Sequence, residues 1–147
     1  MVRLLAMNPY LYWSLLALTC GYALVRGKGD ERFAAFVCVV ASILTPIVLS
    51  PIAERYTHIE SGELLIDCAV LAAFTLVALR SDRFWPLWLA GLQLITSLAH
   101  FLKAIHFDMM PQAYAAAEKF WSYPILIIVA VATWRGHRRR MREGDTA

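Results

Sequence analysis

The sequence predicts an all-α integral membrane bundle of five transmembrane helices, and three observations point to it. Of the 147 residues, 60% are apolar and only 17% are charged, against about 25% charged in soluble domains. The mean hydropathy is +0.56. The apolar residues gather into long stretches and do not alternate with polar residues, as they do in transmembrane strands. These features exclude a disordered chain and an ordinary soluble domain, and we expect one domain over residues 1–147.

The length of the apolar stretches predicts the number of spans. Three stretches lack Asp, Glu, Lys and Arg and approach the roughly 20 residues that a membrane helix needs, namely 9–25, 33–53 and 84–102. Residues 64–79, which contain Asp67, and residues 120–134 are shorter and are expected to extend at their outer ends. We therefore expect spans at about 9–26, 33–53, 62–79, 84–105 and 113–134.

Aromatic residues mark the ends of several expected spans. Tyr10 and Trp13 lie at the start of the first span, and Trp85 opens the fourth. Trp121 and Trp134 flank the fifth. Tyr and Trp collect at membrane interfaces because their rings are apolar and carry one polar edge.

The distribution of basic residues predicts the orientation. With five spans, ten of the 14 Lys and Arg residues fall on one side of the membrane, namely Arg26, Lys28, Arg32, Arg80, Arg83, Arg135, Arg138, Arg139, Arg140 and Arg142. Basic residues are enriched on the cytoplasmic side. We therefore expect the N-terminus outside, the C-terminus inside, and residues 135–147 to form a basic cytoplasmic tail.

A polar stripe runs along the fourth expected span. Gln93, Thr96, Ser97 and His100 have offsets of 0, 3, 4 and 7, which places them on one face of a helix. Most of the remaining residues of this span are apolar. Since a polar face is costly against lipid, we expect the stripe to turn toward the protein interior.

An acidic stripe runs along the third expected span. Glu60, Glu63 and Asp67 have offsets of 0, 3 and 7, and Asp67 lies about one turn inside the span. The short loop after this span makes the third and fourth helices antiparallel neighbours. We predict that the Asp67 carboxyl group lies within side-chain reach of His100 or Gln93, because a carboxylate facing lipid costs about 3 kcal/mol.

The candidate polar site therefore comprises Asp67, Gln93, Thr96, Ser97, His100 and Glu63, and its chemistry has three interpretations. The cluster can join two helices through hydrogen bonds, line a path for protons or a substrate, or bind a metal or haem. The third interpretation is the weakest, because His100 and His106 are six residues apart and diverge by about 120° around a helix. We expect no metal and no cofactor.

Four further candidates lie on the expected outer side, namely His58, Glu60, His106 and Asp108. They form two loop-level pairs of a histidine with an acid. Solvated loop ends explain such pairs, but an outward-facing site would also use them. The sequence leaves both explanations open.

The expected partners follow from the apolar spans and the basic tail. A basic run directly after a helix end is typical of a topology anchor that touches anionic lipid, so we expect no nucleic-acid binding. The lipid bilayer is the expected partner, together with another membrane protein or a second copy of the chain.

The function favoured by the sequence is that of a non-catalytic accessory or interaction subunit, within a small multi-pass protein of the plasma (inner) membrane. Motifs for nucleotide binding, zinc proteolysis and serine hydrolysis are absent from the sequence. The first alternative is a small transporter or proton-coupled permease that uses Asp67, Gln93 and His100. The second is a membrane enzyme with an outward-facing site of histidines and acids, so whether the protein is an enzyme stays open.

Overall fold

The computed structural model describes residues 9–48, 61–105 and 111–144, and the regular secondary structure of these residues is α-helical. Within these three ranges, five helices follow one another: α2 (Pro9–Arg26), α3 (Gly29–Val48), α4 (Ser61–Arg80), α5 (Trp85–Ile105) and α6 (Pro111–Gly144). The predicted all-helical fold class is confirmed for this part of the chain.

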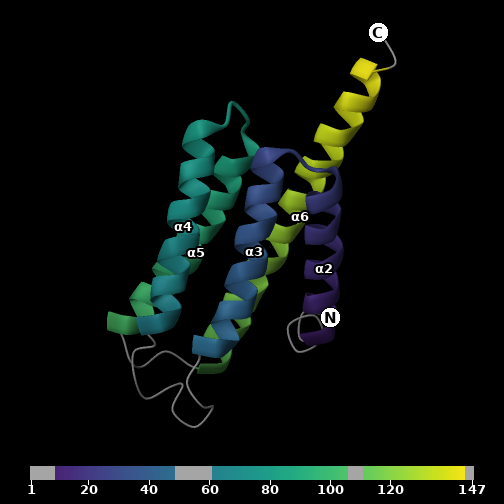
Figure 1. Ribbon diagram of the computed structural model, residues 1–147. Coiled ribbons are helices and arrows are strands. Elements are labelled where there is room, and N and C mark those ends of the chain that lie inside the picture. The colour runs from purple at the N-terminus through teal and green to yellow at the C-terminus, as the bar shows by residue number, and fades with distance from the viewer. Residues whose placement is uncertain (1–8, 49–60, 106–110, 145–147) are drawn as a thin grey trace.

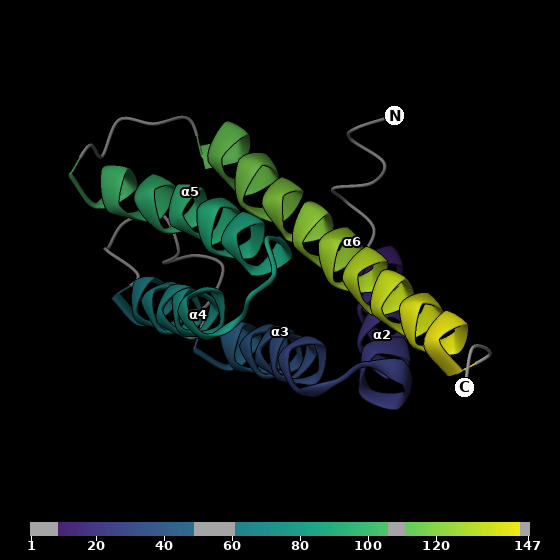
Figure 2. The same ribbon diagram turned by 90° about the horizontal axis from the view of Figure 1, so that it is seen from above.

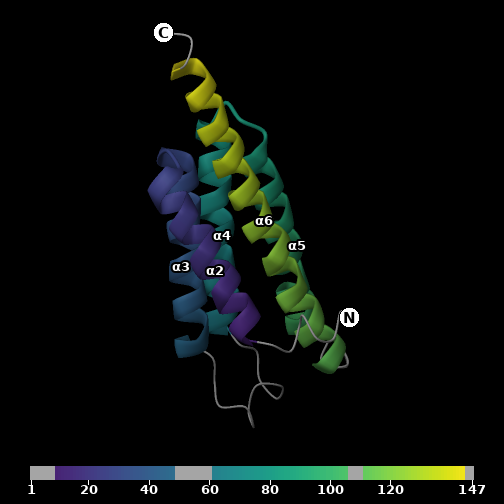
Figure 3. The ribbon, with the colours of Figure 1, turned by 90° about the vertical axis from the view of Figure 1, so that its right-hand side faces the viewer.

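The five helices run up and down in antiparallel succession (Figure 1). Seen from above, α4, α3 and α2 form one row, and α5 and α6 form a second row beside it (Figure 2). The most extensive packing is between α4 and α5, and α6 packs against α2, α5 and α3. With 34 residues, α6 is the longest helix and extends beyond the others at its C-terminal end (Figure 3).

Three of the helices are long and apolar enough to cross a membrane, over Gly29–Val48, Gly62–Arg80 and Trp85–Leu102. The helices α2 and α6 are not among these three. The tyrosines and the tryptophan of α2 lower its hydropathy. Large apolar side chains are nevertheless exposed on every helix, including Leu18, Ile47, Leu65, Leu94 and Ile127. Such an apolar exterior suits a bundle surrounded by lipid better than one surrounded by water.

Two helices extend past the spans expected from hydropathy. The helix α3 begins at Gly29, where the Glu31 carboxylate accepts a hydrogen bond of 3.0 Å from the backbone N–H of Lys28. This contact caps the helix start, as in a capping box. The helix α6 continues through the basic run to Gly144. Residues 49–53 of the expected second span lie outside the described residues.

Proline residues lie at the start of α6 and also inside helices, at Pro46 in α3 and Pro124 in α6. Pro111 is the first residue of α6, where its missing N–H is not needed. Pro46 lies inside α3, and next to it the Thr45 hydroxyl donates to the Ala41 carbonyl at 2.8 Å. The Ser42 hydroxyl is hydrogen-bonded to the Tyr12 hydroxyl at 2.7 Å, which ties α3 to α2.

The hydrophobic core is drawn from all five helices. Its buried members are Leu16, Cys20, Ala23, Ala34, Ala35, Cys38, Phe74, Leu89, Ile125, Leu126 and Val129. The small residues of α2 and α3 allow these two helices to approach closely. We use the term apolar layer for Phe74, Leu89, Leu126 and Val129, which are almost completely buried. Along their helices, these residues separate polar groups at the two ends of the bundle.

Candidate functional site

A group of polar side chains joins α4 to α5, and we call Glu63, Asp67, Gln93 and His100 the α4/α5 cluster. One carboxylate oxygen of Asp67, Oδ2, lies 2.8 Å from His100 Nε2. The other oxygen, Oδ1, accepts a hydrogen bond of 2.9 Å from Gln93 Nε2. The contact predicted between Asp67 and the polar face of the neighbouring helix is therefore present. Because Gln93 and His100 lie about two turns apart, one carboxylate fixes both positions against α4.

The second carboxylate of the α4/α5 cluster lies on the other side of the imidazole ring. Oε2 of Glu63 is 4.0 Å from His100 Nδ1, so each ring nitrogen faces a carboxylate from α4. The side chains of Glu63 and His100 are each 7% exposed, and that of Asp67 is 18% exposed. Chemically, this row of ionisable groups can hold two helices together or exchange protons along the row.

The two hydroxyl residues of the stripe do not join α5 to α4. The Thr96 hydroxyl donates to the Leu92 carbonyl of its own helix at 3.2 Å. The Ser97 hydroxyl is buried and has no hydrogen-bond partner among the described residues. Helical periodicity predicted the shared face correctly, but Ser and Thr often bond to their own backbone, which periodicity does not reveal.

The remaining predicted candidates stay untested. His58, Glu60, His106 and Asp108 lie outside the described residues, so the outward-facing site of histidines and acids remains a prediction. Within residues 9–48, 61–105 and 111–144, no three His, Cys, Asp or Glu side chains are arranged to hold a metal ion.

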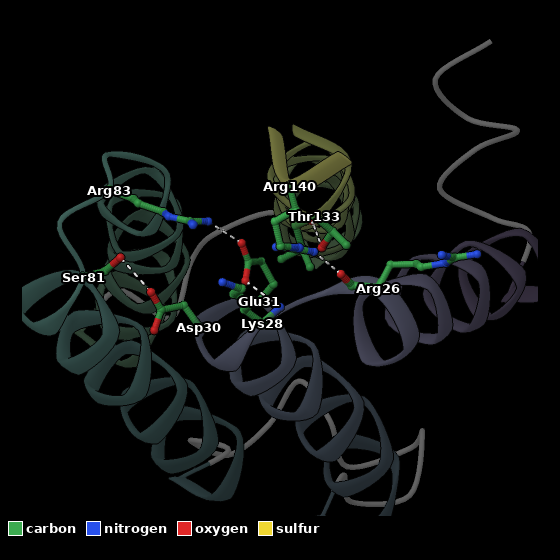
Figure 4. A network of polar contacts seen from close by, with 9 residues as sticks. Arg26, Lys28, Asp30, Glu31, Ser81, Arg83, Thr133 and Arg140 are labelled. Atoms are coloured by element: carbon green, nitrogen blue, oxygen red, sulfur yellow. Dashed lines mark hydrogen bonds and ion pairs between the residues drawn. The ribbon is translucent and has the colours of Figure 1, made fainter. Parts of the chain in front are cut away.

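A second polar group lies at the opposite end of the bundle and was not predicted (Figure 4). Glu31 is only 1% exposed, although it carries a carboxylate. Its Oε1 lies 2.6 Å from Nη1 of Arg83, which follows α4 in the chain. Beside it, the Ser81 hydroxyl donates to Asp30 Oδ2 at 2.8 Å. These two contacts attach the start of α3 to the loop between α4 and α5.

The same end of the bundle includes α6. Nη2 of Arg140 donates a hydrogen bond to the Arg26 carbonyl, at the last residue of α2. Gly136, one turn earlier on α6, lies against Glu31. We use the term basic junction for Glu31, Arg83, Gly136 and Arg140.

One signal for the basic junction is visible in the sequence. The spacing Lys28-x-x-Glu31 places an acid at the third position of a helix start, where its carboxylate can accept the backbone N–H of Lys28. This spacing does not predict that Glu31 is buried. The distribution of basic residues places Arg83 and Arg140 on one side of the membrane and does not show which groups they contact. No family model, curated protein or solved structure matches the chain, so a function must be argued from its own residues.

Proposed function

We propose that the chain is a five-span protein of the inner membrane, with its N-terminus outside and its C-terminus in the cytoplasm, and that it acts as a non-catalytic accessory or interaction subunit. One observation carries this proposal: the polar side chains of the α4/α5 cluster are paired with one another. Asp67 uses both carboxylate oxygens on α5. Hydrogen bonds between membrane helices contribute about 0.6 kcal/mol each, which is sufficient for a structural role.

Two further observations support the five spans and their orientation. The five helices alternate in direction, and each of them exposes large apolar side chains. The basic residues at the end of α2 and in the last turns of α6 lie at the same end of the bundle, and we assign this end to the cytoplasm.

Reporter fusions at the C-terminus test the orientation. A fluorescent protein that folds only in the cytoplasm should be bright, and an alkaline phosphatase that is active only outside should be inactive. The opposite result would overturn the assigned orientation. The number of spans is tested with a variant that lacks the three native cysteines and has one cysteine at the N-terminus. This cysteine is labelled with an impermeant maleimide in intact cells. Protection of this cysteine would mean that one of the five helices does not cross the membrane.

Cross-linking in the native membrane tests the accessory role. A photoreactive amino acid is placed singly at the exposed positions Leu18, Ile47, Leu65, Leu94 and Ile127, with the buried Leu126 as the matched control for Ile127. We expect one discrete cross-linked protein from a subset of the exposed positions and none from Leu126. Cross-links to lipid alone from all five positions would contradict an interaction subunit.

The second candidate function, a proton-coupled permease, is favoured by two specific observations. Asp67 keeps part of its side chain exposed. The Ser97 hydroxyl on α5 is buried without a partner among the described residues. Ionisable groups inside a membrane protein often mark such pathways. Against a continuous path, the apolar layer separates this region from the polar groups at the other end.

A flux measurement separates the two candidates. The purified protein is reconstituted into vesicles containing a pH-sensitive dye, and wild type is compared with Asp67→Asn and with Asp82→Asn, which removes an exposed carboxylate. The accessory proposal predicts the same proton leak for all three proteins. A proton flux that is present in wild type and Asp82→Asn but lost in Asp67→Asn would contradict the accessory proposal and support the permease.

A further inference from the structure

The basic junction contains more positive than negative charge. Its single carboxylate, Glu31, already accepts the backbone N–H of Lys28 on Oε2 and the guanidinium of Arg83 on Oε1. The second guanidinium, that of Arg140, donates through Nη2 to an uncharged backbone carbonyl. One acid and two arginines therefore give the four residues of the junction a net charge of +1. The nearby Asp30 carboxylate accepts a hydrogen bond from the uncharged Ser81 hydroxyl.

Arg140 also has a donor that nothing in the described structure uses. Its Nη1 atom is buried and has no hydrogen-bond partner among the described residues. A buried, unpaired donor is costly, and more so when it belongs to a charged group. An additional acceptor with a negative charge would remove both costs.

Gly136 shows how closely the charged groups converge. A Cβ atom at Gly136 would lie 3.1 Å from Glu31 Oε1, 3.4 Å from Arg140 Nη1 and 3.5 Å from Arg83 Nη1. The Nη1 atoms of Arg83 and Arg140 are thus held near one point on α6. Figure 4 shows the two arginine side chains on either side of Glu31. The Arg83 side chain is 41% exposed, so the junction opens to the surroundings of the bundle on that side.

We propose that the basic junction binds the phosphate group of an anionic phospholipid, through Arg140 Nη1 and the exposed part of Arg83. Guanidinium groups bind phosphate oxygens through charge-assisted hydrogen bonds. The inference rests on the proposed membrane location. A lipid is favoured over free phosphate because the junction lies where the apolar helices end. Trp134 lies two residues before Gly136 on α6, and the Arg138 guanidinium carbon is 5.3 Å from the centroid of its ring. Headgroups of a bilayer lie at this level.

Lipid retention by matched variants tests this proposal. Arg139 is the control for Arg140, because it is exposed, lies one residue away and pairs with Glu143 on its own helix at 3.0 Å. The full chain in a mild neutral detergent is mixed with phosphatidylglycerol or phosphatidylcholine, and the lipid retained per protein is measured by native mass spectrometry. We expect selective retention of phosphatidylglycerol and about a tenfold weaker affinity in Arg140→Gln, the effect of one lost charge-assisted hydrogen bond. Arg139→Gln should stay close to wild type.

Further variants and conditions separate the alternatives. Arg140→Lys keeps the charge but lacks the planar fork of two donors, so it should also lose affinity while folding normally by circular dichroism. Equal losses in Arg139→Gln and Arg140→Gln, or no loss in Arg140→Lys, would show a general charge effect and overturn the site. Displacement of the lipid by millimolar inorganic phosphate would assign the junction to free phosphate instead. Alkaline extraction of native membranes reports separately on the membrane location, so a protein that stays in the membrane without lipid selectivity refutes only this inference.

Discussion

Nε2 of His100 lies 2.8 Å from Oδ2 of Asp67, across the interface between α5 and α4. Asp67 also accepts a hydrogen bond from Gln93, so Asp67→Ala removes two contacts between the helices. We expect this variant to lower the free energy of unfolding by about 1–3 kcal/mol, because buried polar groups of α5 lose a partner. Thermal unfolding in detergent, followed by circular dichroism, measures the effect.

Two other variants control this prediction. Asp67→Asn keeps one carbonyl oxygen as an acceptor and should cost less than Asp67→Ala. Asp82→Asn removes an exposed carboxylate and should leave the unfolding midpoint unchanged. A wild-type midpoint for Asp67→Ala would mean that the α4/α5 cluster does not stabilise the bundle.

Glu31 is expected to contribute more to the free energy of unfolding than an exposed acid near a helix end would. The variant Glu31→Gln removes the charge that faces Arg83 at 2.6 Å inside the protein, and we expect a loss of about 1–3 kcal/mol. Glu143→Gln is the matched control, because its pair with Arg139 is exposed and such surface pairs contribute less than about 1 kcal/mol. Raising the salt concentration should reduce the destabilisation caused by Glu143→Gln more than that caused by Glu31→Gln, because salt screens exposed charge pairs more than buried ones. Equal destabilisation by both variants would contradict the burial of Glu31.

Gly136 should tolerate alanine poorly, whereas Gly91 should accept it. A Cβ atom at Gly136 would meet Glu31 Oε1 at 3.1 Å, so the basic junction must shift and the unfolding midpoint should fall. A Cβ atom at Gly91 on α5 meets nothing within 4 Å. Gly91→Ala should therefore stabilise the protein by up to about 1 kcal/mol through helix propensity. Stabilisation of similar size by Gly136→Ala and Gly91→Ala would show that the basic junction accommodates the added Cβ atom without a shift.

Ser97→Ala distinguishes a structural from a functional α4/α5 cluster. The Ser97 hydroxyl is buried and has no partner among the described residues, so its removal should leave stability unchanged or raise it slightly. The unfolding midpoint in detergent measures this effect. A lower midpoint would reveal a bound water or ligand that uses the hydroxyl. Unchanged stability with a lost phenotype in cells would favour the permease over the accessory subunit.

The contact between Asp67 and His100 could be predicted because it depends only on helical periodicity and on the pairing of adjacent antiparallel helices. Both properties are encoded locally, by offsets of three, four and seven residues and by a short loop. The all-helical fold class could be predicted for a similar reason, since stretches of apolar residues show which segments suit a lipid environment.

The basic junction could not be predicted in the same way. Glu31 and Arg83 are separated by 52 residues, and their contact depends on how α3 approaches the loop between α4 and α5. The length of α6 could not be predicted for another reason. Hydropathy identifies only the residues that suit lipid, and the helix continues beyond them through the basic residues to Gly144. Arg and Met are good helix formers, and no proline interrupts this run.

The apolar layer of Phe74, Leu89, Leu126 and Val129 has an electrical consequence. A transmembrane voltage falls mainly across the region of lowest dielectric constant, and moving one elementary charge through it corresponds to about 2.3 kcal/mol per 100 mV. The layer is such a region, with the α4/α5 cluster on one side and the basic junction on the other. Because the charges of each group stay on their own side, little of this energy couples to either of them. We therefore expect the conformation of the bundle to be insensitive to the membrane voltage.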